Sequence, residues 1–290
     1  MAQSPLLSRA TLDGVLLRVP CPRVALEADL ARLGPLRVAP SASIPGDLCA
    51  LHLEIWRVRG GAVQLGPLDQ HAWSGRFGAA FAAMFGAGVL GPRALARCES
   101  AFGAMSRAAT RPLATYSELM LAVPGVVIGG RDERPHSLVL GMVTDSALAR
   151  WADSALGFGY QKRPGVFRDD ARGEWSVALD GAGPLVSVTS AATRDVSSGH
   201  ESFPDIDDVF GQPLLGVTGR RRLVASSLRR ALSQADARAR AVPARLRVHG
   251  ASLRGLLAAS HDLPAYSRRS PWGALRFENL EAQVSYPCPL

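Results

Sequence analysis

The sequence predicts a mainly β protein with flanking helices, of the α+β class, built as a closed or nearly closed antiparallel β-barrel. Short apolar or alternating segments recur along the chain with turn residues between them, and long helical patterns are few. The 290 residues, of which 47% are hydrophobic and 20% charged, are enough to bury a full core. They fit a single enlarged domain that spans residues 1–290.

Two strands separated by a short helix are predicted in the N-terminal part. The strands fall at residues 12–19 and 48–58, where apolar residues dominate or alternate with polar ones. The helix falls around residues 26–33, and a proline-rich connection from 35 to 45 leads into the second strand.

Glu54 lies in the second strand, on the face that it shares with His52 and Trp56. A glutamate with apolar neighbours on an alternating strand usually marks the solvated side of a sheet. The same position could also hold a functional carboxylate, so both interpretations of Glu54 stay open.

Residues 61–111 are predicted to form a helical insertion. Within them, residues 77–90 (FGAAFAAMFGAGVL) contain no charge, and three phenylalanines and a methionine can share one helix face. As a helix this segment would span about 21 Å, which is short of the roughly 30 Å hydrocarbon core of a membrane. It is expected to pack as a helical hairpin, to contact another subunit or to cover the pocket, and simple packing is favoured.

The central part is predicted to hold strands at residues 114–127 and 137–143, followed by a short helix at 145–156. Thr144 or Asp145 is the expected cap of this helix. Two glycines then end the helix, and the chain becomes extended again and re-enters the core with the only lysine of the sequence.

Short strands and loops are predicted for the C-terminal part. Residues 191–208, rich in Ser, Gly and Asp, are expected to form a loop, and an arginine- and alanine-rich connection precedes the last strand. The strands are predicted at residues 175–179, 185–190, 214–217, 222–228 and 275–285.

Lys162 stands out chemically, because every other side chain among the 33 Lys and Arg residues is arginine. Arginine keeps its charge, whereas a buried lysine can lose its proton and act as a nucleophilic amine. A lysine retained by chance on the surface is the alternative. The position of Lys162 on a strand that re-enters the core favours a Schiff-base residue.

Three short motifs resemble those of the acetoacetate decarboxylase family. Residues 160–163 (YQKR) resemble the Tyr-Pro-Lys-Lys stretch whose first lysine forms the imine, and residues 116–118 (YSE) resemble a Tyr-x-Glu whose glutamate lies in the active site. Residues 52–55 (HLEI) resemble the strand with a second active-site glutamate. The segments LLAASHDLP and LRFENLEAQVSYP resemble the last loop and strand of the family, so the resemblance runs from about residue 10 to the end.

The resemblance implies a Schiff-base-forming carbon–carbon lyase of the acetoacetate decarboxylase-like type. Such an enzyme decarboxylates a 3-oxo acid through an imine on Lys162 and needs no cofactor. The 45 to 50 extra residues between Glu54 and Glu118 leave a second option, in which the same lysine serves aldol, dehydration or cyclisation chemistry on a larger carbonyl substrate. A non-catalytic ligand-binding barrel is the third.

The resemblance also implies the site residues. Glu118 is expected to orient the substrate or manage protons, with Glu54 as a secondary catalytic residue. Arg9 is expected to act as the N-terminal arginine that binds the substrate carboxylate, and Tyr116 and Arg163 are expected to bind substrate.

The pKa of Lys162 is expected to fall toward about 7 if the residue is to supply a reactive amine. Burial and the neighbouring charge of Arg163 are two sources of such a shift. Since adjacent side chains on an extended strand point to opposite faces, Arg163 is expected to face away, and burial is expected to dominate.

Other function classes find little support. The formal net charge is +8, but the arginines are dispersed along the sequence, so neither nucleic acid nor a membrane is expected as a partner. The expected partner is a small keto acid or another carbonyl compound. The four cysteines and six histidines show no paired metal-ligand spacing, so no metal is expected. A cytoplasmic homo-oligomer is expected, and nucleotide and serine-hydrolase motifs are missing from the sequence.

Overall fold

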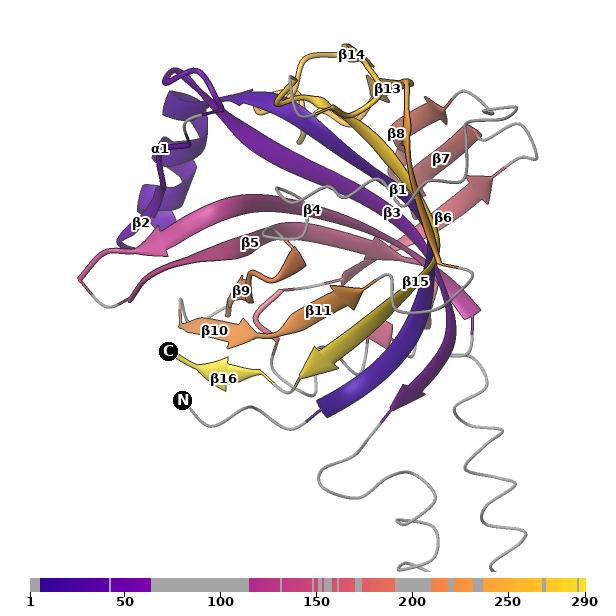
Figure 1. Ribbon diagram of the computed structural model, residues 1–290, viewed down its shortest axis with the longest axis horizontal. Helices are drawn as coiled ribbons and strands as arrows, with labels where there is room; N and C mark the ends of the chain where they lie inside the picture. The colour runs from indigo at the N-terminus through magenta and orange to yellow at the C-terminus, as the bar shows by residue number, and fades with distance from the viewer. Residues whose placement is uncertain are drawn as a thin grey trace, which may run out of the picture.

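The computed structural model describes residues 6–41, 43–63, 115–130, 132–147, 149–150, 153, 158–160, 162–169, 174–190, 210–218, 222–231, 237–267, 270–285 and 287–290. These residues form one helix and a large, strongly curved sheet of sixteen strands (Figure 1). The predicted mainly β class is confirmed. The predicted insertion at 61–111 lies outside the described residues, except that residues 61–63 continue a strand, and the predicted loop at 191–208 lies outside them too.

Five long strands form the wall of the sheet, and each pairs antiparallel with the next. The order across the wall is β15–β1–β3–β4–β5. All five of these strands were expected close to where they occur, because their apolar residues are dense and regularly spaced. Their bounds are Gly273–Ser285 for β15, Leu6–Pro22 for β1, Leu48–Val63 for β3, Thr115–Ile128 for β4 and Asp132–Thr144 for β5.

The predicted helix after the first strand is α1, Arg23–Leu33. It buries Leu26 and Leu30 against the main core, and it ends where the Gly34 amide donates a hydrogen bond to the Leu30 carbonyl. The following strand β2, Leu36–Val38, pairs with the end of β4 and was not expected in the proline-rich connection. The described part of the chain contains no helix with both the length and the hydrophobicity of a membrane span.

Strand β5 changes its partner midway along its free edge. Through Met142–Thr144 it pairs with β6, Lys162–Asp169, and through Ser137 and Leu138 it pairs with β9, Leu214–Val217. Both pairings are parallel, so the prediction of an antiparallel barrel is wrong at this point. A parallel pairing needs a crossover, and helical residues between β5 and β6 supply it. Residues 139–141 pair with neither strand, which leaves a split in the sheet.

The sheet is not closed, so the predicted closed barrel is wrong for the described residues. From β6 it continues through β7, β8 and β13 and ends at β14. At the other end both edges of β15 are occupied, one by β1 and the other by β11 and β12. The segment that follows β14 meets β15 in an isolated bridge between Ala265 and Ala274. The bounds are β7 Glu174–Leu179, β8 Gly183–Ser190, β10 Leu223–Ser226, β11 Leu228–Ala231, β12 Arg238–Val242, β13 Ala244–Val248, β14 Ser260–Leu263 and β16 Cys288–Pro289.

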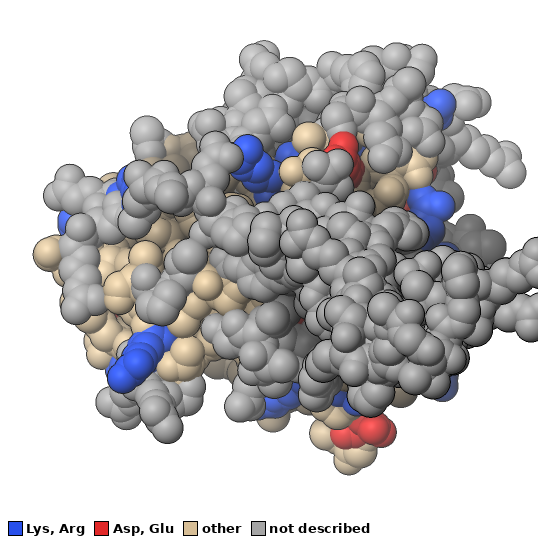
Figure 2. Space-filling view, turned by 90° about the horizontal axis from the view of Figure 1, so that it is seen from below, with Lys and Arg blue, Asp and Glu red and all other residues tan. Residues whose placement is uncertain are grey.

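The arginine- and alanine-rich connection forms strands β12 and β13. In β13 the side chains of Ala244, Leu246 and Val248 are buried, and those of Arg245 and Arg247 are exposed. This alternation is typical of a strand with one solvated face. The described basic side chains are dispersed over the face shown in Figure 2, as their spread along the sequence predicts.

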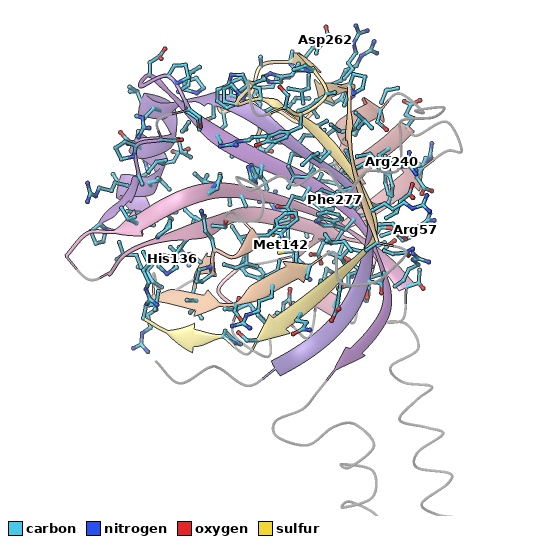
Figure 3. All side chains as sticks on the ribbon, viewed as in Figure 1. Arg57, His136, Met142, Arg240, Asp262 and Phe277 are labelled. Atoms are coloured by element: carbon cyan, nitrogen blue, oxygen red, sulfur yellow. The ribbon has the colours of Figure 1, made fainter. Side chains whose placement is uncertain are left out.

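The two faces of the wall differ in chemistry. One face holds the main apolar core, which is rich in Leu and Val from β1, β3, β4 and β8. The other face packs aromatic and sulfur-containing side chains such as Phe277 and Met142, which lie in the interior in Figure 3. Buried charged residues also lie on this second face, and they form the candidate site.

Candidate active site

Lys162, the first residue of β6, lies between two carboxylates. Its side chain is only 7% exposed. The Nζ atom is 2.5 Å from Oε2 of Glu118 and 2.9 Å from Oδ2 of Asp153. It is also 5.8 Å from the centre of the Tyr116 ring, within the range of a cation–π interaction. Lys162 and Glu118, the two site residues expected in the short motifs, are therefore in direct contact.

Strand register brings these residues together. Met142 of β5 lies opposite Lys162 on one side and opposite Met120 of β4 on the other. Glu118 is two residues before Met120 and so points to the same face of the sheet. Lys162 and Glu118 are 44 residues apart in the chain, yet only one strand separates them in the sheet.

The end of β4 that carries Glu118 is held to the end of β5 by side-chain hydrogen bonds. Thr144 Oγ1 donates a hydrogen bond to the Ser117 carbonyl at 2.9 Å, and the Ser117 amide donates to Asp145 Oδ1 at 2.8 Å. The helical residues that follow are capped by Ser146, whose Oγ accepts from the Ala149 amide at 3.1 Å. The predicted cap at Thr144 or Asp145 is wrong, because both side chains hold Ser117 instead.

Asp153 was not singled out from the sequence. It lies in the predicted helix between β5 and β6, and its side chain is 14% exposed. A signal was available, because Asp153 is four residues after the buried Ala149 and therefore shares its helix face. An acidic residue on the buried side of a helix next to a lone lysine is a candidate partner of that lysine.

Two opposing effects act on the pKa of Lys162. Burial by itself lowers this pKa, but the negative charges of Glu118 and Asp153 together outweigh burial and hold the pKa of Lys162 well above its usual value. Burial raises the pKa of Glu118 and that of Asp153, against the opposing effect of the lysine charge. The predicted lowering of the lysine pKa is wrong for this arrangement, because the sequence did not reveal a second carboxylate.

Two tyrosines border the same cluster. Burial raises the pKa of Tyr116 and that of Tyr160, so both hydroxyl groups stay protonated at neutral pH. The Tyr160 ring packs against Phe158 with 5.6 Å between ring centres, and its hydroxyl bonds to Ser226 of β10. A carbonyl compound next to Lys162 would therefore have neutral hydrogen-bond donors close by.

Glu54 is 1% exposed, so the solvent-facing interpretation is wrong. Its Oε2 accepts a hydrogen bond from Trp56 Nε1 at 2.9 Å and is paired with Arg230 of β11. Trp56 lies opposite Glu118 on the neighbouring strand, and Glu54 therefore lies diagonally across from Glu118 on the same face. Arg230 was not singled out from the sequence, since it lies 176 residues from Glu54 in the chain.

Arg9 and Arg163 lie in different places from this cluster. The Arg9 backbone pairs with Gln283 and Ala62, seven residues along β1 from the position opposite Glu54, or about 23 Å of extended strand. Arg163 is exposed on the face opposite to Lys162, as the strand argument predicted.

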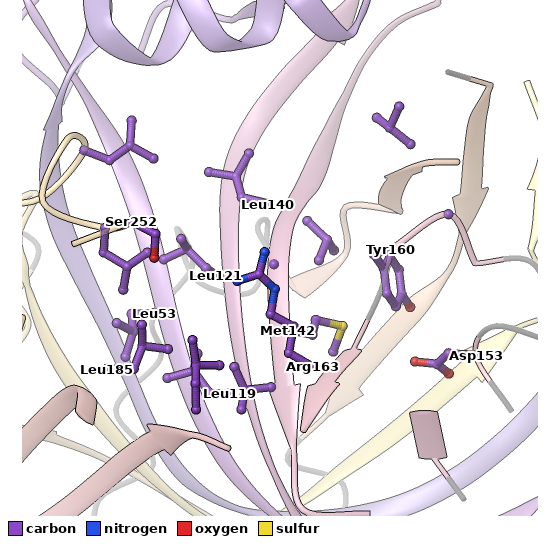
Figure 4. Close-up of a pocket in the computed structure, with 18 of the residues that line it drawn as sticks. Leu53, Leu119, Leu121, Leu140, Met142, Asp153, Tyr160, Arg163, Leu185 and Ser252 are labelled. Atoms are coloured by element: carbon purple, nitrogen blue, oxygen red, sulfur yellow. The ribbon is translucent and has the colours of Figure 1, made fainter. Parts of the chain in front are cut away.

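A cavity of about 630 Å³ lies at the split in the sheet, and Asp153 and Tyr160 line it, whereas Lys162 and Glu118 do not. Figure 4 shows Asp153 and Tyr160 at one end, leucines at the other end and the Arg163 side chain between them. The opening follows from the change of partner on β5, since residues 139–141 line the cavity and pair with neither β6 nor β9. The leucines are Leu33, Leu53, Leu119, Leu121, Leu140, Leu179, Leu185, Leu253 and Leu256.

In sequence the chain matches no protein-family profile and no curated protein. In structure it is similar to acetoacetate decarboxylase and acetoacetate decarboxylase-like enzymes over nearly its whole length.

Three solved structures illustrate this similarity. The acetoacetate decarboxylase of Legionella pneumophila subsp. pneumophila str. Philadelphia 1 is 11% identical, with a TM-score of 0.50 over 100% of this chain and 90% of that one. An acetoacetate decarboxylase-like enzyme of Sphingomonas wittichii RW1 is 14% identical, with a TM-score of 0.53 over 98% and 92%. The enduracididine biosynthesis enzyme MppR complexed with pyruvate is 13% identical, with a TM-score of 0.52 over 100% and 91%. The resemblance stated from short motifs is thus confirmed at the level of the fold.

Proposed function

We propose that this protein is an enzyme that forms a Schiff base between Lys162 and a ketone substrate, and that it decarboxylates a 3-oxo acid. The observation that carries the proposal is the arrangement of one buried lysine against two buried carboxylates, with 2.5 Å between Lys162 Nζ and Glu118 Oε2. Few structural roles require three titratable groups in one buried cluster, whereas acid–base chemistry on a carbonyl does.

The first step is a proton transfer within the cluster. Lys162 is an ammonium ion in this arrangement and cannot attack a carbonyl until it loses a proton. Glu118 is the nearest acceptor, and burial raises the pKa of its carboxyl group, which favours the protonated form. Transfer of the proton to Glu118 leaves a neutral amine, which is the nucleophile that the reaction needs.

The neutral amine then attacks the ketone carbon. A carbon–nitrogen bond forms, and the carbonyl oxygen takes up one proton from a carboxylic acid of the cluster. The nitrogen then gives up a proton to the carboxylate, which passes it to the same oxygen, and loss of water leaves a protonated imine. Asp153 is the second carboxyl group within reach of the nitrogen, and its carboxylate can neutralise the charge of this cation. Two carboxyl groups therefore allow one to carry the proton while the other balances the charge.

Decarboxylation follows from the position of the cation. In a 3-oxo acid the bond to the carboxylate carbon is β to the imine, so its electron pair moves to the imine nitrogen as CO2 leaves. The resulting enamine takes up a proton on carbon, and hydrolysis of the imine releases the ketone and Lys162. A proton on Glu118 would also lower the repulsion between the site and the substrate carboxylate.

A larger carbonyl substrate is the second candidate, because the cavity that Asp153 and Tyr160 line is larger than a four-carbon acid requires. Its volume of about 630 Å³ lies within the range of pockets that bind drug-sized ligands. One enzyme of similar fold, MppR, has been solved with pyruvate, a 2-oxo acid. The same protonated imine can serve aldol, dehydration or cyclisation chemistry on such a substrate.

Borohydride trapping tests the proposal. The protein is incubated with a panel of 3-oxo and 2-oxo acids, reduced, and mapped by mass spectrometry. The chain contains a single lysine, so a modified lysine must be Lys162. We expect trapping and CO2 release with a 3-oxo acid, and imine trapping without CO2 release would favour the second candidate. The absence of trapping with every carbonyl compound would contradict the proposal.

Two variants give a matched control. K162R keeps the positive charge but has no amine that can lose its proton, so it should fold and should not be trapped. The double variant K162R/R163K restores one lysine to the chain and places it on the opposite face of β6. Trapping of this misplaced lysine at the wild-type rate would show that the two carboxylates do not matter.

A further inference from the structure

A second buried cluster of charged and polar side chains lies on the same face as Lys162. Arg18 of β1 is 6% exposed and His52 of β3 is 1% exposed, and the two residues are direct cross-strand partners. Arg230 of β11 has a side chain that is 2% exposed, and it joins the cluster through its ion pair with Glu54. This group, which we call the arginine cluster, takes no part in the chemistry proposed for Lys162.

The arginine cluster has an unbalanced charge. It contains two guanidinium groups and one carboxylate, that of Glu54, which is paired with Arg230. Arg18 forms no ion pair within the described residues. Its Nη1 donates to the Tyr266 hydroxyl at 3.3 Å. His52 adds no charge, because burial, together with the charges of the two arginines, holds its pKa well below the usual value.

Three nitrogen atoms of the arginine cluster are buried without a hydrogen-bond partner. They are Nε of Arg18, Nε2 of His52 and Nε of Arg230. Buried polar nitrogens normally have partners, and a buried cation without a counter-ion is costly. Three such atoms, from β1, β3 and β11, next to an uncompensated positive charge, have the chemistry of an anion site.

We propose that the arginine cluster binds an anionic group, and that this group is a carboxylate at the far end of the substrate. Arg18 supplies the charge, and Arg230 and His52 supply further hydrogen bonds, with the hydrogen of the neutral imidazole on Nε2. The first part of the proposal concerns only the arginine cluster. The second part rests on the proposed function of Lys162.

The spacing of the strands determines which carboxylate this is. Lys162 and Glu54 occupy the same row of the sheet, and β5 and β4 lie between their strands. Three strand spacings separate their backbones by about 14 Å. The carboxylate of a 3-oxo acid lies next to its ketone and cannot reach the arginine cluster while the ketone is on Lys162. The anion is therefore a second acidic group, and the substrate class is a keto diacid.

Thermal shift measurements test anion binding without any catalysis. Saturated dicarboxylates are compared with monocarboxylates of the same length, on wild type and on R18Q. We expect the dicarboxylates to stabilise wild type more, and R18Q to lose this difference. R247Q is the matched control, because Arg247 is an exposed arginine of β13 and its loss changes the net charge equally. Stabilisation by neither ligand series, or an equal loss in R18Q and R247Q, would overturn the anion site.

Borohydride trapping tests the link to Lys162. A series of 3-oxo diacids of six to ten carbons is compared with the monoacids of equal length. In wild type we expect half-maximal trapping at a lower concentration for the longer diacids, and in R18Q an increase of about tenfold or more for those diacids alone. If diacids and monoacids of equal length reach half-maximal trapping at the same concentration in wild type, the assignment of a keto diacid substrate would be overturned. If no ketone is trapped at all, the proposed function fails, while the thermal shifts still decide whether the arginine cluster binds an anion.

Discussion

The Lys162 cluster and the arginine cluster lie on the same face of the sheet, but their charges are unbalanced in opposite directions. Lys162 is one cation facing two carboxylates, Glu118 and Asp153. The arginine cluster has two cations, Arg18 and Arg230, and one carboxylate. An excess of carboxylates lets a buried site hold and exchange a proton. An excess of guanidinium groups cannot be neutralised by loss of a proton, so its charge must be balanced by a bound anion.

Glu118→Gln is expected to have the largest effect, because it removes the proton acceptor of Lys162. The rate of borohydride trapping should fall by about 100- to 10,000-fold at saturating ketone. Asp153→Asn is the matched comparison, and it should lower the rate less, because Glu118 is closer to the nitrogen. A Glu118→Gln rate within twofold of wild type would exclude Glu118 as the base.

Glu54→Gln should mainly change stability. It leaves Arg230 buried without its counter-ion, and such changes typically cost about 3–5 kcal/mol in the free energy of unfolding. Glutamine can still accept the hydrogen bond from Trp56, so the loss reports the charge. Denaturant unfolding measures it, and the double variant E54Q/R230M should recover part of the loss. An unfolding free energy equal to that of wild type would show that the pair is not buried.

The dependence of stability on pH should separate the carboxylates of the Lys162 cluster from ordinary ones. Burial raises the pKa of Asp153 in the folded protein, so the folded state binds a proton more tightly than the unfolded state does. The contribution of Asp153 therefore falls as pH rises from its unfolded pKa near 4 through its raised folded pKa.

Comparing wild type with Asp153→Asn by denaturant unfolding isolates this effect. Wild type should lose stability relative to the variant as pH rises from about 4 toward neutral. The opposite slope would mean that Asp153 is held as an ordinary ionised partner of Lys162.

Arg18→Met should have the smallest effect on stability, because it removes a buried charge that has no carboxylate partner. The free energy of unfolding should stay within about 1 kcal/mol of wild type or rise, since buried charges replaced by apolar groups of similar size are often neutral or stabilising. Arg230→Met is the contrast, because it leaves Glu54 without its partner. Equal destabilisation by the two variants would show that Arg18 has a structural counter-charge.

The long strands could be predicted because each is defined by its own residues. The apolar residues of β1, β3 and β4 are regular enough to locate all three strands and to place Glu54 and Glu118 on defined faces. Pairing is not local in this way. The parallel partners of β5 and the occupied second edge of β15 depend on segments far along the chain, so the open sheet was missed.

The site residues show the same difference between local sequence signals and contacts that form only in the folded chain. Lys162 and Glu118 lie in short motifs and were found, together with the orientation of Arg163. Asp153 and Arg230 were missed, because neither has a motif and each reaches its partner only after the sheet has formed. The direction of the lysine pKa was consequently wrong, since it depends on how many carboxylates surround the nitrogen and not on burial alone.

Nuclear magnetic resonance of the single lysine tests the central claim most directly. Protein labelled with carbon-13 at the lysine ε position gives one lysine signal, that of Lys162. In the free protein this signal should stay in the ammonium form through pH 10.4, the usual lysine pKa, because Glu118 and Asp153 hold the pKa higher. Addition of a 3-oxo acid should replace it with the shifted signal of an ε carbon bonded to an imine nitrogen. A signal that titrates like that of a free lysine and does not change with any keto acid would contradict the account.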